Sequence, residues 1–145
     1  MSSRSDRIRS GELAERAAVN LQTIRYYERR GLLRPAGRTA SGYKQYDLSA
    51  VSTVQFIKQA QRLGFTLGEA GDLLRLRNAE GPRRTTVRAV AAAKVADIEI
   101  RVQQLTSMRD ALVELVSACE AGKNRGCAII EALNTHRDLR EETRR

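Results

Sequence analysis

The stretch RSGELAERAAVNLQTIRYYERRGLL, residues 9–33, decides the fold that we expect for this chain. Its apolar residues recur at helical spacing in two short runs, with a turn at residues 19–20 between them. The hydroxyl of Ser10 is suited to cap the first helix, because it can accept a free backbone N–H. The second helix is expected over residues 21–30, and Gly31 suits the left-handed conformation that often ends a helix. Two short helices around a tight turn predict a helix-turn-helix.

The following segment LLRPAGRTASGYKQY, residues 32–46, breaks this helical period. Proline and glycines punctuate it, and its flanks are long enough only for a two-stranded ribbon, so we predict a β-hairpin wing. Two further helices are expected after the wing. The first covers about residues 48–62 and is capped by Asp47, and the second begins after Thr66 as its cap.

A long helix is predicted over residues 85–118, which contain neither glycine nor proline. Apolar residues recur there with alternating strides of four and three, and Arg109 takes the one charged slot. A helix of this length extends about 50 Å and has too little chain around it to bury such a seam. An antiparallel coiled coil in a homodimer is the favoured interpretation, and a helix folded back on its own head is the alternative. The predicted seam residues are Val95, Ile98, Val102, Leu105, Leu112 and Val116.

The charge distribution indicates a polyanionic partner. The net charge is +9, and residues 1–77 carry 14 Lys or Arg against 7 Asp or Glu, while residues 78–145 carry 12 against 10. A basic half joined to a nearly balanced half predicts a DNA-binding head on a separate body. The sequence has no apolar run of membrane-spanning length and no secretory signal, so we expect a cytoplasmic protein without a membrane partner. Nothing in the spacing of polar residues indicates an enzyme.

Several of these motifs together resemble the MerR family of bacterial transcription regulators, in particular its metal-responsive branch. The resemblance rests on TIRYYERRGLL, GRTASGYKQY, FIKQAQRLGFTLGEAGDLL and a long helix that ends in a cysteine loop. These motifs occur in the right order, and the match spans about residues 8–133. It implies a mainly α fold with a winged helix-turn-helix, a dimerisation helix and a C-terminal metal-binding loop.

The second helix of a helix-turn-helix reads the major groove, so its outward side chains are candidate DNA contacts. Thr23, Arg25 and Tyr26 lie on that helix, whereas Tyr27 is expected in the core. The family resemblance implies that the wing grips the DNA backbone beside the groove. The wing residues implied in this role are Arg38, Tyr43 and Lys44.

A two-fold dimer predicts a pseudo-palindromic operator in double-stranded DNA. The resemblance further implies that this operator lies in a promoter with an overlong spacer. Bound protein would then bend and untwist the DNA so that RNA polymerase can engage, which makes the protein an activator of a metal-resistance promoter.

Both cysteines of the chain flank the short loop CEAGKNRGC, residues 119–127. Thiolates are soft ligands, and two of them suit ions of low coordination number such as Cu(I), Ag(I), Au(I) or Hg(II). Zinc normally takes four ligands, and His136 is interpreted as a solvated residue of the polar tail. Cys119 and Cys127 are therefore the predicted metal ligands.

The resemblance narrows the choice of ion. Divalent-ion sensors of this kind place a third cysteine at the start of the long helix, and monovalent-ion sensors place a serine, whereas this chain has Arg84 there. Arg88 stands where the copper-type relatives carry a lysine, so both arginines are expected in the second coordination shell. Cu(I) is the favoured ion. Hg(II) bound by two thiolates, a thiol-redox switch and an architectural DNA-binding protein without a ligand are the alternatives.

The expected organisation follows from these elements. The winged helix-turn-helix with its two additional helices is expected over residues 1–77 and a connector over 78–84. The dimerisation helix follows over 85–118, then the effector loop and short helix over 119–133, and a disordered tail over 134–145.

Overall fold

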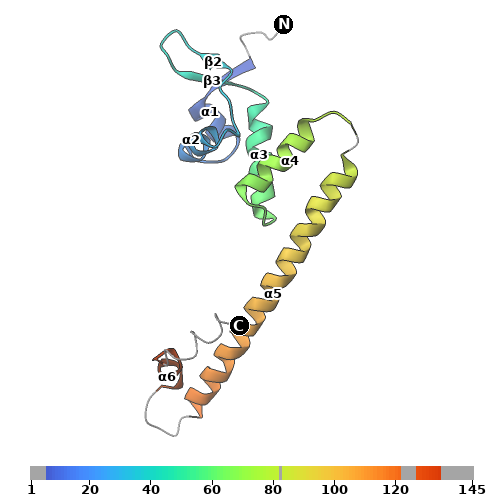
Figure 1. Cartoon of the computed structure of the whole chain (residues 1–145). Coiled ribbons are helices and arrows are strands. Elements are labelled where there is room, and N and C mark those ends of the chain that lie inside the picture. The colour runs from blue at the N-terminus through green and yellow to red at the C-terminus, as the bar shows by residue number, and fades with distance from the viewer. Residues whose placement is uncertain (1–5, 82, 122–126, 135–145) are drawn as a thin grey trace. The chain divides into compact units, whose positions relative to one another are not determined.

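The computed structural model describes residues 6–81, 83–121 and 127–134 of the chain (Figure 1). The described residues form six helices and one three-stranded sheet. The fold is therefore mainly α, as predicted. The chain divides into two compact units after Lys94, so about the first three turns of the long helix belong with the N-terminal head.

The sheet consists of β1 (Arg7–Arg9), β2 (Gly37–Arg38) and β3 (Lys44–Asp47), in the order β1-β3-β2 with both pairings antiparallel. The predicted hairpin wing corresponds to β2 and β3, while β1 is an addition that we did not predict. Ile8 pairs with Tyr46 across the sheet, and both side chains are buried. This pair anchors the wing to the head, because one face of the small sheet packs into the core.

The helix-turn-helix consists of α1 (Ser10–Arg16) and α2 (Leu21–Arg29). The predicted cap at Ser10 is wrong: this residue is the first of α1, and no side chain caps the helix. The reason is that β1 runs directly into α1, so strand pairing fixes the entry of the chain. Asn20 caps α2 by accepting a hydrogen bond from the backbone N–H of Thr23 at 2.8 Å.

The head is completed by α3 (Ala50–Arg62) and α4 (Leu67–Asn78), which pack against each other. Asp47 ends β3 and does not cap α3, because the chain needs two more residues to turn from strand to helix. The predicted cap at Thr66 is confirmed, since it forms a reciprocal capping box with Glu69. The core lies between these helices, the helix-turn-helix and the sheet; its fully buried side chains include Leu13, Ile24, Tyr46, Val54 and Ile57.

The long helix α5 (Arg84–Glu120) is 37 residues long, which corresponds to about 55 Å. It is followed after Cys127 by the short α6 (Ala128–Asn134). The predicted helix over 85–118 is thus extended at both ends, and the predicted connector is shorter than expected. Residues 122–126 within the cysteine loop, His136 and nearly all of the predicted tail lie outside the described residues. No helix in the described part of the chain has the length and apolarity to cross a bilayer.

Candidate functional site

The helix α2, which is predicted to be the recognition helix, is held in place by its inner face. Ile24 and Tyr27 are buried in the core, and the Tyr27 hydroxyl donates a hydrogen bond to Oε1 of Gln61 at 2.9 Å. The expectation that Tyr27 belongs to the core is therefore confirmed. With these side chains inward, Arg25 and Tyr26 are exposed on the outer face. The α2 helix thus presents a cation and a phenol to solvent, as a DNA-reading helix requires.

Thr23 differs from these two residues because its polar atoms already have a local partner. Its hydroxyl donates to Oδ1 of Asn20 at 3.0 Å, the same atom that accepts from its backbone N–H. The side chain is half-buried in the first turn of α2. Thr23 therefore serves the N-terminal cap of the recognition helix.

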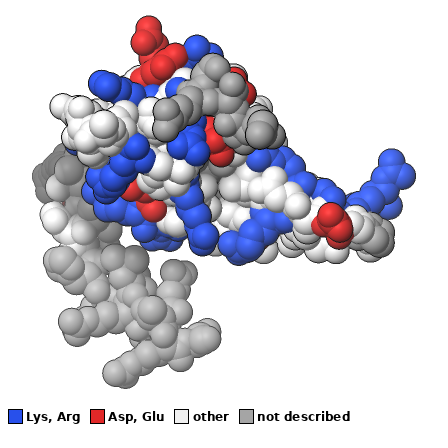
Figure 2. All heavy atoms as spheres, turned by 90° about the horizontal axis from the view of Figure 1, so that it is seen from above, with Lys and Arg blue, Asp and Glu red and all other residues white. Residues whose placement is uncertain are grey.

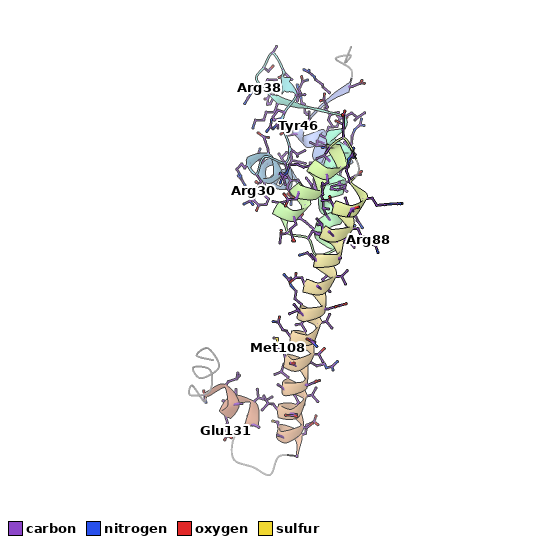
Figure 3. The ribbon with its side chains drawn as sticks, turned by 45° about the vertical axis from the view of Figure 1, so that its right-hand side comes forward. Arg30, Arg38, Tyr46, Arg88, Met108 and Glu131 are labelled. Atoms are coloured by element: carbon purple, nitrogen blue, oxygen red, sulfur yellow. The ribbon has the colours of Figure 1, made fainter. Side chains whose placement is uncertain are left out.

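The tip of the wing is held by hydrogen bonds within the hairpin. The Arg38 guanidinium donates to the carbonyl of Gly42 at 2.9 Å, and the backbone N–H of Tyr43 donates to the Thr39 hydroxyl at 3.0 Å. Gly42 has a φ of +86°, which glycine adopts without a steric penalty. Arg38 lies out on the wing in Figure 3. The ring of Tyr43 is 59% exposed and available to a ligand.

Two arginines of β1 extend this surface, and the sequence analysis missed both of them. The Arg9 guanidinium lies 5.0 Å from the centroid of the Tyr43 ring, a cation–π distance that joins β1 to the wing. Arg7 lies beside Gly37, whose missing Cβ leaves room for the guanidinium. The alternation of Arg7, Ile8 and Arg9, with one apolar residue between two cations, was the available signal for a half-buried strand.

A hollow of about 860 Å³ lies between the sheet, α1 and α2. Four cationic side chains line it, and two carboxylates, Glu12 and Glu28, line it as well. Figure 2 shows the molecule from above, and on this face Lys and Arg side chains cover more of the surface than Asp and Glu side chains. A concave basic surface next to an exposed helix fits the backbone of a nucleic acid. The cationic residues are Arg7, Arg9, Arg25 and Lys44.

Glu28 lines this hollow and accepts hydrogen bonds from two residues of β3. One carboxylate oxygen accepts from the Lys44 ammonium and the other from the Tyr46 hydroxyl. Burial on its own raises the pKa of Glu28, but these two hydrogen bonds and the charges of Lys44 and Arg38 lower it overall. Burial, together with the bond to Glu28, raises the pKa of Tyr46 to about 12. Lys44 is thus ion-paired within the head.

The predicted seam residues on α5 are all solvent-exposed in the single chain. Their exposed fractions lie between 40% and 63%, although every one of them is a large aliphatic residue. Lys94 is the one buried residue among the described residues of α5. An apolar stripe of this size is typical of a protein interface. Arg109, the charged slot of the seam, pairs along the helix with Asp110 at 3.0 Å.

The two cysteines lie close together, and their role as ligands of one ion stays a prediction. Their Sγ atoms are 3.6 Å apart, which is far longer than a disulfide bond of about 2.05 Å. Cys119 is exposed near the end of α5, and Cys127 is half-buried just before α6. Metal–thiolate bonds are about 2.3 Å long for zinc, so two sulfurs at this separation are both within reach of one ion.

The helix α6 sets the two thiols apart chemically. The backbone N–H groups of Ile130 and Ile129 hydrogen-bond the sulfur of Cys127, and with the contact to Cys119 they lower its pKa. The pKa of Cys119 is raised, chiefly by its hydrogen bond to Cys127 and by the charge of that neighbour. Within the described part of the chain, no group of three or more His, Cys, Asp or Glu side chains is arranged to hold a metal. Among the described residues, the two cysteine sulfurs are therefore the candidate donors.

Arg84 and Arg88 lie in the first two turns of α5 and are exposed. Figure 3 shows Arg88 pointing away from the helix. Both guanidinium groups are thus accessible to a second molecule. Their predicted place beside a metal site involves the partner subunit and stays a prediction.

Comparison with known proteins identifies the family. The family model described as "MerR HTH family regulatory protein" matches residues 8–76, and the model "MerR, DNA binding" matches residues 51–115. A mercuric resistance operon regulatory protein of Shigella flexneri is 40% identical over 124 residues, with 85% of each chain covered. The transcriptional regulator CueR of Escherichia coli is 33% identical over 123 residues, with 85% of this chain and 91% of that protein covered.

Solved structures agree with this result. A transcription regulator of Ralstonia metallidurans in complex with lead(II) is 31% identical, with a TM-score of 0.75 and coverage of 87% of this chain and 98% of the other. The regulator MerR of Bacillus megaterium in complex with mercury(II) is 34% identical, with a TM-score of 0.67 and the same coverage. The two family models together span residues 8–115, which include the helix-turn-helix, the wing and most of the long helix, and the chain belongs to the MerR family of DNA-binding transcription regulators.

Proposed function

We propose that this protein is a dimeric transcription regulator that senses a soft, thiophilic metal ion through Cys119 and Cys127. The observation that carries the proposal is the 3.6 Å separation of the two sulfurs at the ends of the loop. Relatives of similar identity are named for mercuric resistance or as CueR, and one structural neighbour contains lead(II). These names support a metal ligand in general. The identity of the ion is argued from the two cysteine ligands.

The donor set favours a monovalent ion of the copper type. Two thiolates satisfy Cu(I), Ag(I) or Au(I), whereas lead and zinc sites normally recruit further ligands. Two thiolates and one monovalent cation leave a net charge of −1, and a guanidinium from Arg84 or Arg88 of the partner subunit would offset it. Hg(II) with two thiolates is the second ion that this pair suits. Cys119 and Cys127 would hold the ion, which would link the end of α5 to the start of α6.

DNA binding is proposed for the outer face of α2 and for the wing. Arg25 and Tyr26 are exposed on the recognition helix, and Tyr43 and Arg38 are exposed on the wing. Arg7 and Arg9 add cations in the same basic hollow. Thr23 and Lys44 are assigned supporting roles, because the Thr23 hydroxyl donates to Asn20 and the Lys44 charge is paired with Glu28. Arg38 stays a proposed contact, because its bond to the Gly42 carbonyl uses only one of the five N–H donors of the guanidinium. The proposed target is a pseudo-palindromic operator.

Dimerisation is proposed through the exposed seam of α5, from Val95 to Val116. Burying six large aliphatic side chains at about 1.5–3 kcal/mol each offsets the cost of association. A dimer then places two heads on two half-sites. In keeping with the family resemblance, the proposed output is activation of a metal-resistance promoter by distortion of its spacer, with RNA polymerase as the partner.

Competitive metal titration tests the proposal. The reduced protein is titrated with Cu(I), Ag(I), Hg(II) and Zn(II), and promoter transcription is measured in parallel with bound metal. We expect one ion per protomer and sulfur-only coordination in X-ray absorption. Cys119→Ser and Cys127→Ser should each lose metal binding and the transcriptional response. Oxygen or nitrogen ligands, or full response in both serine variants, would overturn the metal-sensing role.

A thiol-redox sensor on the same scaffold is the second candidate, and the close approach of the two sulfurs favours it as well. Mild oxidant would join Cys119 and Cys127 in a disulfide, with the oxidant accepting two electrons and the two thiols releasing their protons. Thiol titration before and after oxidation separates the candidates. A regulated promoter with an unchanged count of free thiols excludes the redox sensor.

A further inference from the structure

Glu28 is a carboxylate that lines the basic hollow, on the helix that is proposed to read DNA. A negative charge there opposes phosphate binding, since it repels the polyanion that the surrounding cations attract. Its side chain is 20% exposed, so it is a partly solvent-accessible group of the surface itself. A carboxylate at this position is therefore expected to make another contribution to DNA binding that is larger than this repulsion.

The contacts of Glu28 connect the two DNA-reading elements of the head. Glu28 lies on α2, while its two donors, Lys44 and Tyr46, lie on the wing strand β3. Tyr46 is fully buried and pairs with Ile8 of β1, and Figure 3 shows it inside the head. The carboxylate thus joins the recognition helix to the central strand of the sheet. Charge-assisted bonds of this kind are stronger than neutral ones and fix geometry.

We infer that Glu28 is a positioning residue for DNA binding, which fixes the wing against the recognition helix through Lys44 and Tyr46. This inference rests on the proposed DNA-binding role of α2 and the wing. Lys44 then acts mainly through Glu28, while Arg25, Arg38 and Tyr43 remain the proposed contacts with the backbone. Removal of the Glu28 charge is expected to weaken DNA binding even though it makes the surface more positive.

Glu12 provides a matched control for the direction of this change in DNA affinity. It lines the same hollow, and its described ion pair is with Arg16 one turn away on α1, at 2.9 Å. Both side chains of that pair are about half exposed, so the pair contributes little to the fold. Glu12→Gln removes the same charge from the same surface without disconnecting the wing. Simple electrostatics predicts tighter DNA binding for both glutamine variants, whereas the positioning role predicts opposite signs.

The experiment measures DNA affinity of the full-length dimer by fluorescence anisotropy at several salt concentrations. The probes are a duplex that the wild-type protein enriches from random-sequence DNA and a scrambled duplex of the same composition. Glu28→Gln is expected to bind the enriched duplex at least about tenfold more weakly, with a smaller change on the scrambled one. Glu12→Gln is expected to bind as tightly as the wild type or slightly more tightly. Equal or tighter binding by Glu28→Gln overturns the inference.

If thermal unfolding shows that Glu28→Gln does not fold, the salt dependence of DNA binding by Lys44→Gln tests the same inference. A lysine on a phosphate contributes about 0.9 to the slope of log affinity against log salt, whereas a lysine held by Glu28 contributes little. We expect weaker binding with an unchanged slope, in contrast to Arg25→Gln, which should lower the slope. A slope lowered as in Arg25→Gln, or unchanged affinity, overturns the inference. Failure of the wild type to enrich any duplex would instead refute the proposed DNA-binding function.

Discussion

Lys94 is a buried ammonium whose Nζ atom lies 2.9 Å from Oε1 of Glu69. The same nitrogen lies 5.7 Å from the centroid of the Phe65 ring. Glu69 also accepts from the backbone N–H of Thr66 at 2.8 Å, within the capping box of α4. The first turns of α5 are thereby fastened to the start of α4, so movement of these turns is coupled to the packing of the head.

Removal of either partner of this ion pair should destabilise the head, but to different extents. Lys94→Met keeps the apolar stem packed and leaves Glu69 with solvent and its capping bonds, so we expect a loss of about 1 kcal/mol. Glu69→Ala removes the bond to Lys94 and also half of the capping box of α4, so it should cost more. Urea unfolding of the two variants measures the difference. A larger loss for Lys94→Met would contradict this account.

The stability of the head should fall in acid through Glu69. The hydrogen bond from Lys94, followed by that from the Thr66 backbone, lowers the pKa of Glu69 from 4.5 to about 2. Because the folded pKa lies below the unfolded one, the stabilisation is complete above about pH 4.5 and is lost as the pH falls towards 2. Urea midpoints measured from about pH 7 down to about pH 3 should show this decline. In Lys94→Met the decline should be shallower; an identical slope in that variant would refute the assignment to Glu69.

The sequence predicted the elements with local signals and missed those that depend on distant partners. Thr66 predicts the start of α4 because its capping box lies within four residues, and α5 follows from a continuous seam. In contrast, the alternation of Arg7, Ile8 and Arg9 is only three residues long, and β1 is recognised as a strand only when its pairing with β3, such as Ile8 with Tyr46, is known. Lys94 resembles a surface residue until its partner Glu69, 25 residues earlier, is placed beside it.

A charge placed in the seam of α5 should dissociate the proposed dimer. Leu105→Glu buries an unpaired carboxylate in each protomer, which costs several kcal/mol, so the dimer dissociation constant should rise at least about a thousandfold. Gln104→Glu introduces the same group one residue away, outside the seam, and should leave the dimer intact. Sedimentation equilibrium compares the two. Equal dimerisation of both variants would place the interface elsewhere.

Arg9 of β1, beside the wing, should contribute to DNA affinity by neutralising the charge of a phosphate. Arg9 stacks on Tyr43 at 5.0 Å, so it is held in the basic hollow and need not be ordered on binding. Arg9→Gln should weaken binding to enriched and scrambled duplexes alike and lower the salt slope by about 0.9 for each phosphate that the arginine neutralises. A weakening confined to the enriched duplex would instead indicate that Arg9 reads base edges.

The two thiols should differ in reactivity, in the order opposite to their exposure. Cys119 is the more exposed, so access alone predicts faster alkylation there. However, the backbone N–H groups at the start of α6 lower the pKa of Cys127, and the thiolate is the form that reacts.

Single-cysteine variants isolate each thiol. Cys119→Ser retains Cys127 together with its bonds from Ile130 and Ile129. At near-neutral pH, iodoacetamide should therefore alkylate this variant faster than it alkylates Cys127→Ser, which retains only Cys119. Raising the pH through the thiol range should narrow the gap, because Cys119 then ionises as well. Faster reaction of Cys119 at neutral pH would show that access governs the pair. Faster reaction of Cys127 would instead make it the sulfur that first captures a soft ion, because metal ligation requires the thiolate. Cys119, whose sulfur lies 3.6 Å away, would then complete the pair of ligands.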